Sequence, residues 1–144
     1  MKFVPLSRQK HGDKTWKRPD TYRFAAREAV VPLVGREVAT AAVNMPMGFI
    51  KEGAGYQLVA LLSFAPGSNL FVNDEGKWAG NYIPAMFRSY PFRLLRVEGR
   101  DNMVLCIDEE SEFIKDGAGE EIFFDGGDQP SKSVAQIGEF LTEL

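Results

Sequence analysis

Apolar residues occur along the chain in short runs that alternate with turn-forming residues. Residues 48–51 and 56–64 are two such runs, and glycines at positions 53 and 55 lie between them. Glycine adopts the positive φ that a tight connection needs, so this pattern predicts a β-hairpin. Residues 58–62 are apolar without interruption, which is typical of a strand covered on both faces.

Further segments have the length and composition of strands. Residues 70–72 and 77–79 flank an Asn-Asp-Glu-Gly sequence, which predicts a second hairpin. Residues 103–107 and 122–124 are short apolar runs, residues 92–97 alternate loosely between apolar and polar positions, and each segment is predicted as a single strand. No strand alternates with a helix over the length of a βαβ unit, so a doubly wound sheet is not expected.

Helical patterns occur in three places. Residues 33–43 place apolar side chains on one face, and residues 82–90 have Pro84 in the first turn, where a missing N–H costs nothing. Residues 131–144 form an amphipathic pattern with Ser131 in position to cap it. The elements together predict an α+β fold: mainly antiparallel sheet, short helices packed on it, and a C-terminal amphipathic helix.

The chain of 144 residues has the length of one domain. Residues 1–21 are polar, basic and irregular, which predicts a flexible or loosely docked N-terminal extension. Residues 22–144 are predicted to form the folded domain. Its last helical pattern runs to Leu144 with no stop signal after it, so we expect the domain to be truncated at its C-terminal end.

The net charge of −3 hides an asymmetry along the chain. Residues 1–28 carry eight Lys/Arg and three Asp/Glu, whereas residues 98–144 carry three and thirteen. A solvated surface is the favoured interpretation, and the alternative is that the basic head and the acidic tail attract each other within one molecule or between molecules. Self-association through them would weaken with added salt. Nucleic-acid binding is not expected, because the domain behind the basic head is acidic.

Residue counts and motifs exclude several classes of site. One cysteine, Cys106, excludes an internal disulfide, and one histidine, His11, excludes a multi-His metal site. No phosphate-binding glycine loop and no nucleophile elbow occurs, and we expect no cofactor. Neither a signal peptide nor a transmembrane segment is expected, so the default location is the cytoplasm.

Carboxylates are concentrated in residues 108–112, which read Asp-Glu-Glu-Ser-Glu. Such a cluster can bind calcium or supply an acid–base pair, but it lacks EF-hand spacing and a partner carboxylate that the sequence can locate. A solvated loop is the favoured interpretation, and a carboxylate-based hydrolase is the less favoured one. Cys106 lies in an apolar run, where a thiol is normally inert packing.

Aromatic and arginine residues are interleaved between positions 78 and 93. Aromatic faces bind rings and peptides, and arginine offers forked donors to a carboxylate or phosphate. The candidate residues for ligand or partner binding are therefore Trp78, Tyr82, Arg88, Tyr90 and Arg93. Clustered aromatic residues also build protein cores, so a structural role is the alternative.

A set of short motifs runs through residues 22–144. They are Met45-Pro46-Met47-Gly48-Phe49, Leu58-Val59-Ala60-Leu61-Leu62, Asn69-Leu70-Phe71-Val72-Asn73, Tyr82-Ile83-Pro84-Ala85 and Arg88-Ser89-Tyr90-Pro91-Phe92, with Glu37, Trp78 and Gly80. The combined pattern resembles the bacterial SapC family. The resemblance implies a protein associated with the surface layer, and it brings no catalytic residues with it.

Two functions follow as predictions. The first is a non-catalytic interaction module of the surface layer or envelope, a location that only the family name implies. The second is a cytoplasmic accessory protein that binds a small molecule or peptide in a pocket lined by Trp78, Tyr82 and Tyr90, where Arg88 or Arg93 fixes an anion. An enzyme is not the favoured interpretation.

Overall fold

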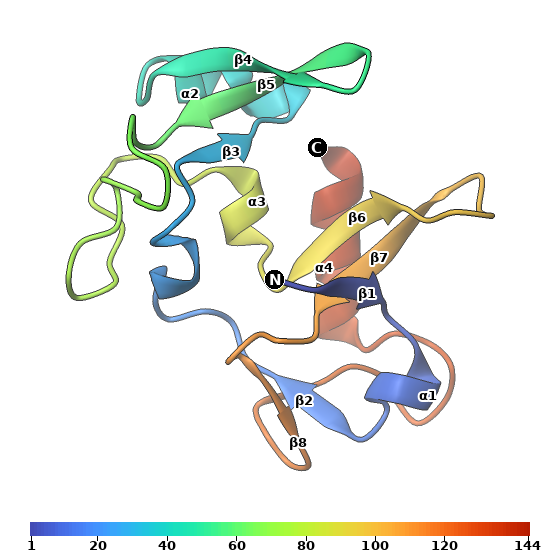
Figure 1. Ribbon diagram of the computed structural model, residues 1–144. Coiled ribbons are helices and arrows are strands. Elements are labelled where there is room, and N and C mark those ends of the chain that lie inside the picture. The colour runs from blue at the N-terminus through green and yellow to red at the C-terminus, as the bar shows by residue number, and fades with distance from the viewer. The chain divides into compact units, whose positions relative to one another are not determined.

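Three small antiparallel sheets and several short helices make up the protein, as the computed structural model of residues 1–144 shows (Figure 1). The chain divides into two compact units. Met1–Pro19 and Ser89–Glu143 form the first unit, and Asp20–Arg88 forms the second. The predicted α+β class, with antiparallel sheets and a C-terminal helix, is confirmed.

The second unit is built on a sheet of strand order β3-β5-β4. Strands β4 (Met47–Glu52) and β5 (Gly55–Leu61) form the hairpin that the sequence predicted, coloured green in Figure 1. Gly53 in its turn has a φ of 58°, a value that glycine adopts without strain. Strand β3 (Val30–Pro32) pairs with the other edge of β5. The central strand β5 is therefore bonded on both sides.

The helices of the second unit are shorter than their sequence patterns. The pattern over residues 33–43 becomes the 3-10 turn η2 (Gly35–Glu37) and the helix α2 (Val38–Ala42). The pattern over residues 82–90 becomes α3 (Ala85–Arg88). These elements and the 3-10 turn η1 (Arg23–Ala25) are each about one turn long, so tertiary packing rather than helix propensity holds them.

The second predicted hairpin is only partly formed. Residues 70–72 and 77–79 make one isolated bridge, between Val72 and Trp78. The side chain of Asn73 explains this, because its Oδ1 accepts the backbone N–H groups of Glu75 and Lys77 at 3.0 and 2.9 Å. A side chain thus satisfies donors in the turn itself.

The core of the second unit consists mainly of small and branched apolar side chains. Its buried members are Ala25, Val31, Leu33, Ala41, Met45, Ala60, Leu62 and Phe87. In β5, the neighbouring residues Val59 and Ala60 are both fully buried. Since neighbours in a strand point to opposite faces, both faces of β5 are covered there, as its uninterrupted apolar sequence predicted.

The first unit contains two sheets. Their strand orders are β1-β7-β6 and β8-β2-β9. The strands are β1 (Phe3–Pro5), β2 (Lys14–Trp16), β6 (Phe92–Arg96), β7 (Met103–Asp108), β8 (Ile114–Asp116) and β9 (Glu121–Ile122). The strands predicted over residues 92–97 and 103–107 correspond to β6 and β7, and the strand predicted over residues 122–124 overlaps β9 only at Ile122. The other three strands were not predicted, because three residues are too few to show a period.

Helix α4 (Lys132–Glu143) confirms the predicted C-terminal amphipathic helix. It lies behind β6 and β7 in Figure 1, and its buried Val134 and Ile137 belong to the core cluster of the first unit. Ser131 caps it, because the backbone N–H of Val134 donates to Ser131 Oγ at 3.3 Å. Neither α4 nor any shorter helix has the length and apolar composition of a membrane span.

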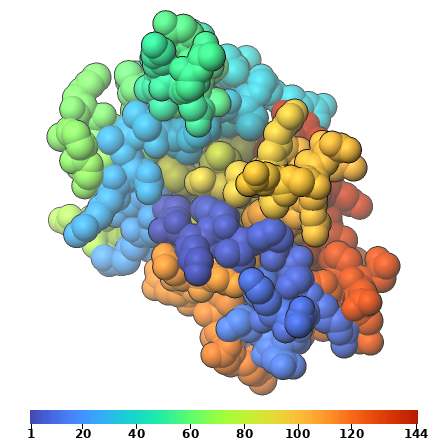
Figure 2. Space-filling view, turned by 45° about the vertical axis from the view of Figure 1, so that its right-hand side comes forward, coloured from blue at the N-terminus to red at the C-terminus, as the bar shows by residue number.

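Residues 1–19 belong to the first unit, which differs from the loosely docked extension that their polar sequence predicted. Strands β1 and β2 pair with strands from the end of the chain, and α1 (Arg8–His11) connects them. Trp16 is only 2% exposed and packs edge-on against Phe92, with ring centroids 4.8 Å apart. Figure 2 shows the blue N-terminal residues lying against orange residues from the end of the sequence.

Candidate functional site

The five residues predicted to bind a ligand or partner are divided between the two units. Trp78, Tyr82 and Arg88 belong to the second unit, whereas Tyr90 and Arg93 belong to the first. A single pocket formed by all five stays a prediction. The surroundings of each residue within its own unit are determined.

Trp78 lies in an aromatic cluster of the second unit. Its ring stacks on Phe71 with centroids 5.2 Å apart and planes 17° from parallel, and Tyr22 and Phe87 lie within 6 Å. A Cβ added at Gly80 would come within 3.0 Å of both Phe71 and the indole of Trp78, so this stacking needs a glycine there. Trp78 is partly buried and packs against the core, in agreement with the structural alternative considered for it.

The carboxylate of Glu37, at the end of η2, is buried and accepts three hydrogen bonds. Its Oε1 accepts the backbone N–H of Val34 at 2.9 Å. Its Oε2 accepts the hydroxyl of Tyr82 and the backbone N–H of Ala85, both at 2.8 Å. The N–H of Ala85 belongs to the first turn of α3, where no helical acceptor exists. Glu37 therefore joins η2 to α3.

Arg88 carries this network to the surface of the second unit. One of its Nη atoms donates to the hydroxyl of Tyr82 at 3.2 Å, and its Nε donates to the carbonyl of Ile83 at 3.0 Å. Burial raises the pKa of Tyr82, the bond to Glu37 raises it further, and Arg88 opposes the shift. The structure thus brings Tyr82 and Arg88 together with Glu37, a residue that the predicted site did not include. The sequence signal for Glu37 was that it is the one acidic residue in the helical pattern over residues 33–43.

Tyr90 and Arg93 occupy packed positions in the first unit. Tyr90 is buried, and its hydroxyl donates to Oδ2 of Asp108 at 2.8 Å. Burial raises the pKa of Tyr90 far above its ordinary value, the bond from Ser111 lowers it, and Asp108 raises it again. Arg93 in β6 stacks on the ring of Phe3, with its guanidinium carbon 4.5 Å from the ring centre.

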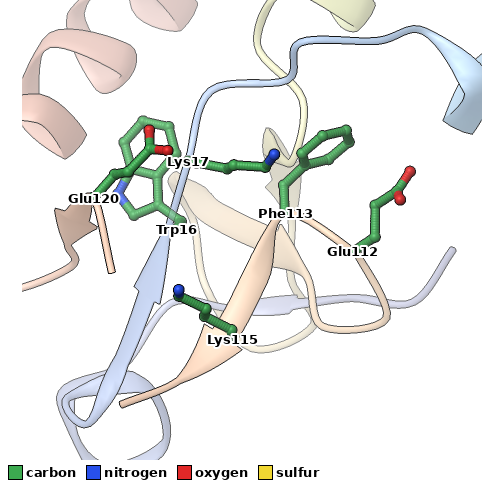
Figure 3. A pocket seen from close by; sticks show the side chains of 6 residues that line it. All are labelled: Trp16, Lys17, Glu112, Phe113, Lys115 and Glu120. Atoms are coloured by element: carbon green, nitrogen blue, oxygen red, sulfur yellow. The ribbon is translucent and has the colours of Figure 1, made fainter. Parts of the chain in front are cut away.

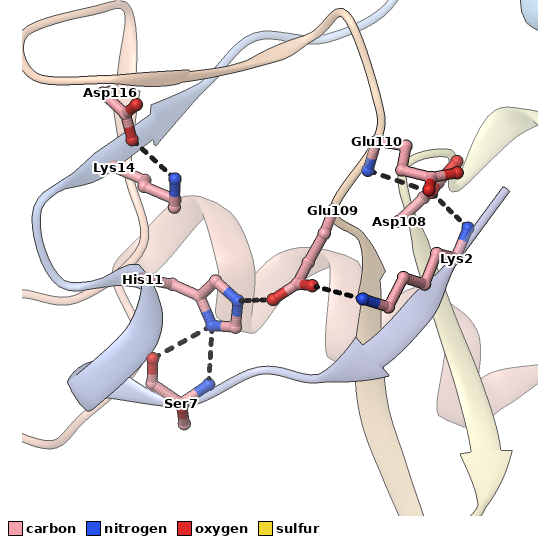
Figure 4. A network of polar contacts seen from close by, with 8 residues as sticks. All are labelled: Lys2, Ser7, His11, Lys14, Asp108, Glu109, Glu110 and Asp116. Carbon is pink, nitrogen blue, oxygen red and sulfur yellow. Dashed lines mark hydrogen bonds and ion pairs between the residues drawn. The ribbon is translucent and has the colours of Figure 1, made fainter.

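Asp108, at the end of β7, is buried rather than part of a solvated loop. Its Oδ1 accepts the backbone N–H of Lys2 at 2.7 Å and that of Glu110 at 3.3 Å (Figure 4). With the bond from Tyr90, the carboxylate has donors at both oxygens. Asp108 therefore ties the N-terminal strand to β7. The expectation of solvated charge for residues 108–112 is wrong at this position, since long-range donors offset the cost of burial.

His11 is fully buried in the first unit, although the sequence placed it in a polar stretch. The backbone N–H of Ser7 donates to Nδ1 at 3.0 Å, and Nε2 lies 3.3 Å from Oε1 of Glu109 (Figure 4). Nδ1 also lies 3.0 Å from the carbonyl oxygen of Ser7. A carboxylate can only accept, so Nε2 donates to Glu109, and His11 links the turn after β1 to the residues that follow β7.

The basic head meets the acidic tail within the same chain. Oppositely charged groups pair there at 2.5 to 4.0 Å. The pairs are the N-terminal amine with Glu110, Lys2 with Glu109, Arg8 with Asp128 and Lys14 with Asp116. Exposed pairs of this kind contribute only about 0.2–1 kcal/mol each, so they guide the docking of the head more than they stabilise it.

Both units contain a concave site. The site of the first unit has a volume of about 250 Å³ and lies beside β2 and β8 (Figure 3). It is lined by Trp16, Lys17, Glu112, Phe113, Lys115 and Glu120. The groove of the second unit has about 360 Å³ and is mainly apolar. It is lined by Pro46, Leu61, Leu62, Ser63, Phe64, Leu70, Phe71 and Ala79.

Comparison with known families decides the membership of the chain. The SapC family model matches residues 6–144. The chain belongs to the SapC family. No curated protein and no solved structure matches it. The matched range of this SapC protein begins before residue 22, so it includes α1 and β2 of the first unit.

The interior polar groups of the SapC chain serve mainly to join segments. Glu37 and Asp108 are each surrounded by hydrogen-bond donors, and His11 bridges Ser7 and Glu109. Cys106 is buried, and burial raises the pKa of its thiol. No group of three or more His, Cys, Asp or Glu side chains is placed to hold a metal ion.

Proposed function

We propose that this SapC-family protein is a non-catalytic interaction module that binds a protein of the surface layer or cell envelope through the apolar groove of its second unit. The observation that carries the proposal is the exposure of Phe64 and Leu70, at 89% and 74%, beside that groove. Large apolar side chains exposed at a concave apolar site are typical of protein interfaces.

The floor of the groove is well supported. Phe71 lines it and stacks on Trp78, and Leu62 beneath it is almost fully buried. A preformed pocket of this kind accepts an aromatic or aliphatic side chain of a partner with little reordering. In this proposal Trp78 acts by positioning Phe71.

A non-catalytic role agrees with the state of the reactive groups. The buried carboxylates, the histidine and the cysteine have their polar atoms in structural bonds or in apolar surroundings. The choice of an envelope protein as partner rests on the association with the surface layer that the family name implies.

Co-sedimentation with purified bacterial envelopes that contain a surface layer tests this function. We expect the unaltered protein to sediment with the envelopes, and the double variant Phe64→Ser/Leu70→Ser to bind at least about tenfold more weakly. Phe49→Ser is the matched control, because Phe49 is 70% exposed in the same unit but does not line the groove. Equal binding by the double variant would exclude the groove, and no sedimentation of any form would exclude the envelope partner.

A second candidate function is the binding of a small anion or a peptide carboxylate by the second unit, with Tyr82 and Arg88 as proposed contacts. The observation that favours it is the support of the exposed Arg88, whose guanidinium is oriented by Tyr82 and Ile83. Calorimetric titration with phosphate and with an acetylated dipeptide tests it. We expect Arg88→Gln to weaken binding and Arg27→Gln to leave it unchanged. No heat of binding with the unaltered protein would exclude this function.

Self-association through the basic head and the acidic tail is a further proposal for the partner. The ion pairs within the chain already use Lys2, Arg8 and Lys14, so any such association is expected to be weak. Sedimentation velocity at low and at high salt tests it. A dimer that dissociates with salt would support the proposal, and a monomer under both conditions would exclude it.

A further inference from the structure

The concave site of the first unit combines a buried donor with charges of both signs (Figure 3). We propose that it binds a small zwitterion of the α-amino-acid type. In this arrangement, the indole N–H of Trp16 and the ammonium of Lys115 hold the ligand's carboxylate, and Glu120 holds its ammonium group. The site belongs to the first unit, so the inference does not depend on the groove of the second.

Trp16 supplies the first argument. Its side chain is 98% removed from solvent, and its Nε1 has no hydrogen-bond partner. A buried N–H without an acceptor is costly, so such groups are rarely left unsatisfied. Trp16 lines the cavity, and in Figure 3 its nitrogen is on the ring edge nearest Glu120. A carboxylate oxygen of a ligand is a suitable acceptor, and reaching it requires a small movement of the cavity wall, because Nε1 itself is buried.

The charges around the cavity supply the second argument. Lys17 and Lys115 are balanced there by Glu112 and Glu120, so the lining has no net charge. Glu112, Lys115 and Glu120 are exposed and make no ion pair within the protein. Charges of both signs around one cavity favour a ligand that carries both signs as well, rather than a simple anion or cation.

The size and the walls of the cavity supply the third argument. Its volume of about 250 Å³ lies just below the 300–1,000 Å³ range of sites for drug-sized ligands, which suits a single amino acid. Phe113 forms an apolar wall and is itself only 3% exposed. The Nζ of Lys17 is held 5.6 Å from the centre of that ring. The floor is therefore rigid, and the charged groups are at the rim.

Gly119 keeps the turn between β8 and β9 close to β2. A Cβ at this position would lie 2.2 Å from Oγ1 of Thr15 and 2.8 Å from Cε of Lys115. Only glycine permits this approach, because the nearest atoms belong to Thr15 in the central strand β2 as well as to the flexible side chain of Lys115. The close approach places Glu120, the next residue, at the cavity beside Trp16.

The test is a nuclear magnetic resonance titration of the two indole N–H signals, since the chain has two tryptophans. Trp78 is an internal control, because its Nε1 is also buried without a partner but lies in the second unit. The probes are glycine, glutamine and phenylalanine, each up to about 10 mM, which is ample for a millimolar Kd. We expect at least one amino acid to shift the Trp16 signal saturably and to leave the Trp78 signal in place.

Variants and simpler probes separate the outcomes. Lys115→Gln and Glu120→Gln should each raise the Kd about tenfold, and Lys51→Gln in the second unit should not change it. Acetate or methylamine alone should bind much more weakly than the zwitterion. The proposal is overturned if no amino acid moves the Trp16 signal, or if acetate moves it equally well. It is also overturned if Glu120→Gln shifts the Trp16 signal in the absence of ligand while no ligand shifts it in the unaltered protein. Glu120 is then the acceptor of the indole N–H.

Discussion

The hydroxyl of Tyr82 donates a hydrogen bond of 2.8 Å to the buried carboxylate of Glu37, which lies 45 positions earlier in the sequence. The same carboxylate oxygen accepts the N–H of Ala85 at the start of α3. The pair therefore links the turn η2 to the helix α3, and it also supports Arg88 at the surface. Its strength can be measured, since one atom of Tyr82 makes the contact.

Removing that atom with Tyr82→Phe should lower the free energy of unfolding by about 1–3 kcal/mol, because a buried carboxylate loses one of its donors. Urea denaturation followed by circular dichroism measures the change. Tyr56→Phe is the control, since Tyr56 is 73% exposed and should change stability by less than about 0.5 kcal/mol. Equal effects of the two variants would contradict a structural role for the Tyr82–Glu37 bond.

Because of Tyr90, the free energy of unfolding should decrease in alkaline solution. Its pKa is raised in the folded protein, chiefly by burial, whereas an unfolded chain releases the tyrosine proton near pH 10. The unfolded state therefore binds fewer protons than the folded state above about pH 10, so the free energy of unfolding decreases as pH rises through that range.

The Tyr90→Phe variant isolates this contribution. It should be less stable than the unaltered protein at neutral pH, because Asp108 loses a donor. The difference should shrink above about pH 10, where only the unaltered protein has a Tyr90 proton to release on unfolding. Urea denaturation at several pH values measures it. A difference that is constant up to pH 11 would show that burial of Tyr90 does not affect its titration.

The N-terminal residues should be essential to the stability of the first unit. Trp16→Ala should cost about 3–5 kcal/mol, because Trp16 fills the core between Phe92 and Phe123. Lys10→Ala in α1 is the control, since Lys10 is exposed and should have little effect. If thermal denaturation gave the two variants the same midpoint, the basic head would be the loosely docked extension that its composition suggests.

The ion pair of Lys14 with Asp116 should contribute little to stability, and this contribution should decrease with added salt. A double-mutant cycle with Lys14→Gln and Asp116→Asn should give a coupling of about 0.2–1 kcal/mol at low ionic strength. Both side chains reach solvent, so about 0.5 M NaCl should remove most of it. A coupling that persists at high salt would mean that the pair is less accessible to ions than its exposure indicates.

Local sequence patterns were sufficient to predict about half of the helices and strands. The β4–β5 hairpin was predictable because Gly53 and the flanking apolar runs are adjacent in sequence. Helix α4 was predictable because Val134 and Ile137 share one helical face and Ser131 caps it. In each case the decisive contacts join residues a few positions apart, which a sequence pattern can show.

The candidate site was less predictable. The sequence indicated Tyr82 and Arg88 as neighbours on aromatic grounds, and the structure joins them. It did not place Glu37 beside them, because the role of Glu37 depends on contacts with Tyr82 and Ala85, which are far away in the sequence. The buried indole of Trp16 and the cavity beside it were missed as well, because residues 10–18 look like a solvated basic arm when read alone.

The sequence by itself determined the α+β class, the hairpin, the C-terminal helix and membership of the SapC family. Only the tertiary structure decided that the basic head is part of the fold, and that Asp108 and His11 are buried. The physical reason is distance along the chain. The N–H of Lys2 reaches Asp108 across 106 positions, and no local pattern of polarity records that a charge will meet its donor so far away.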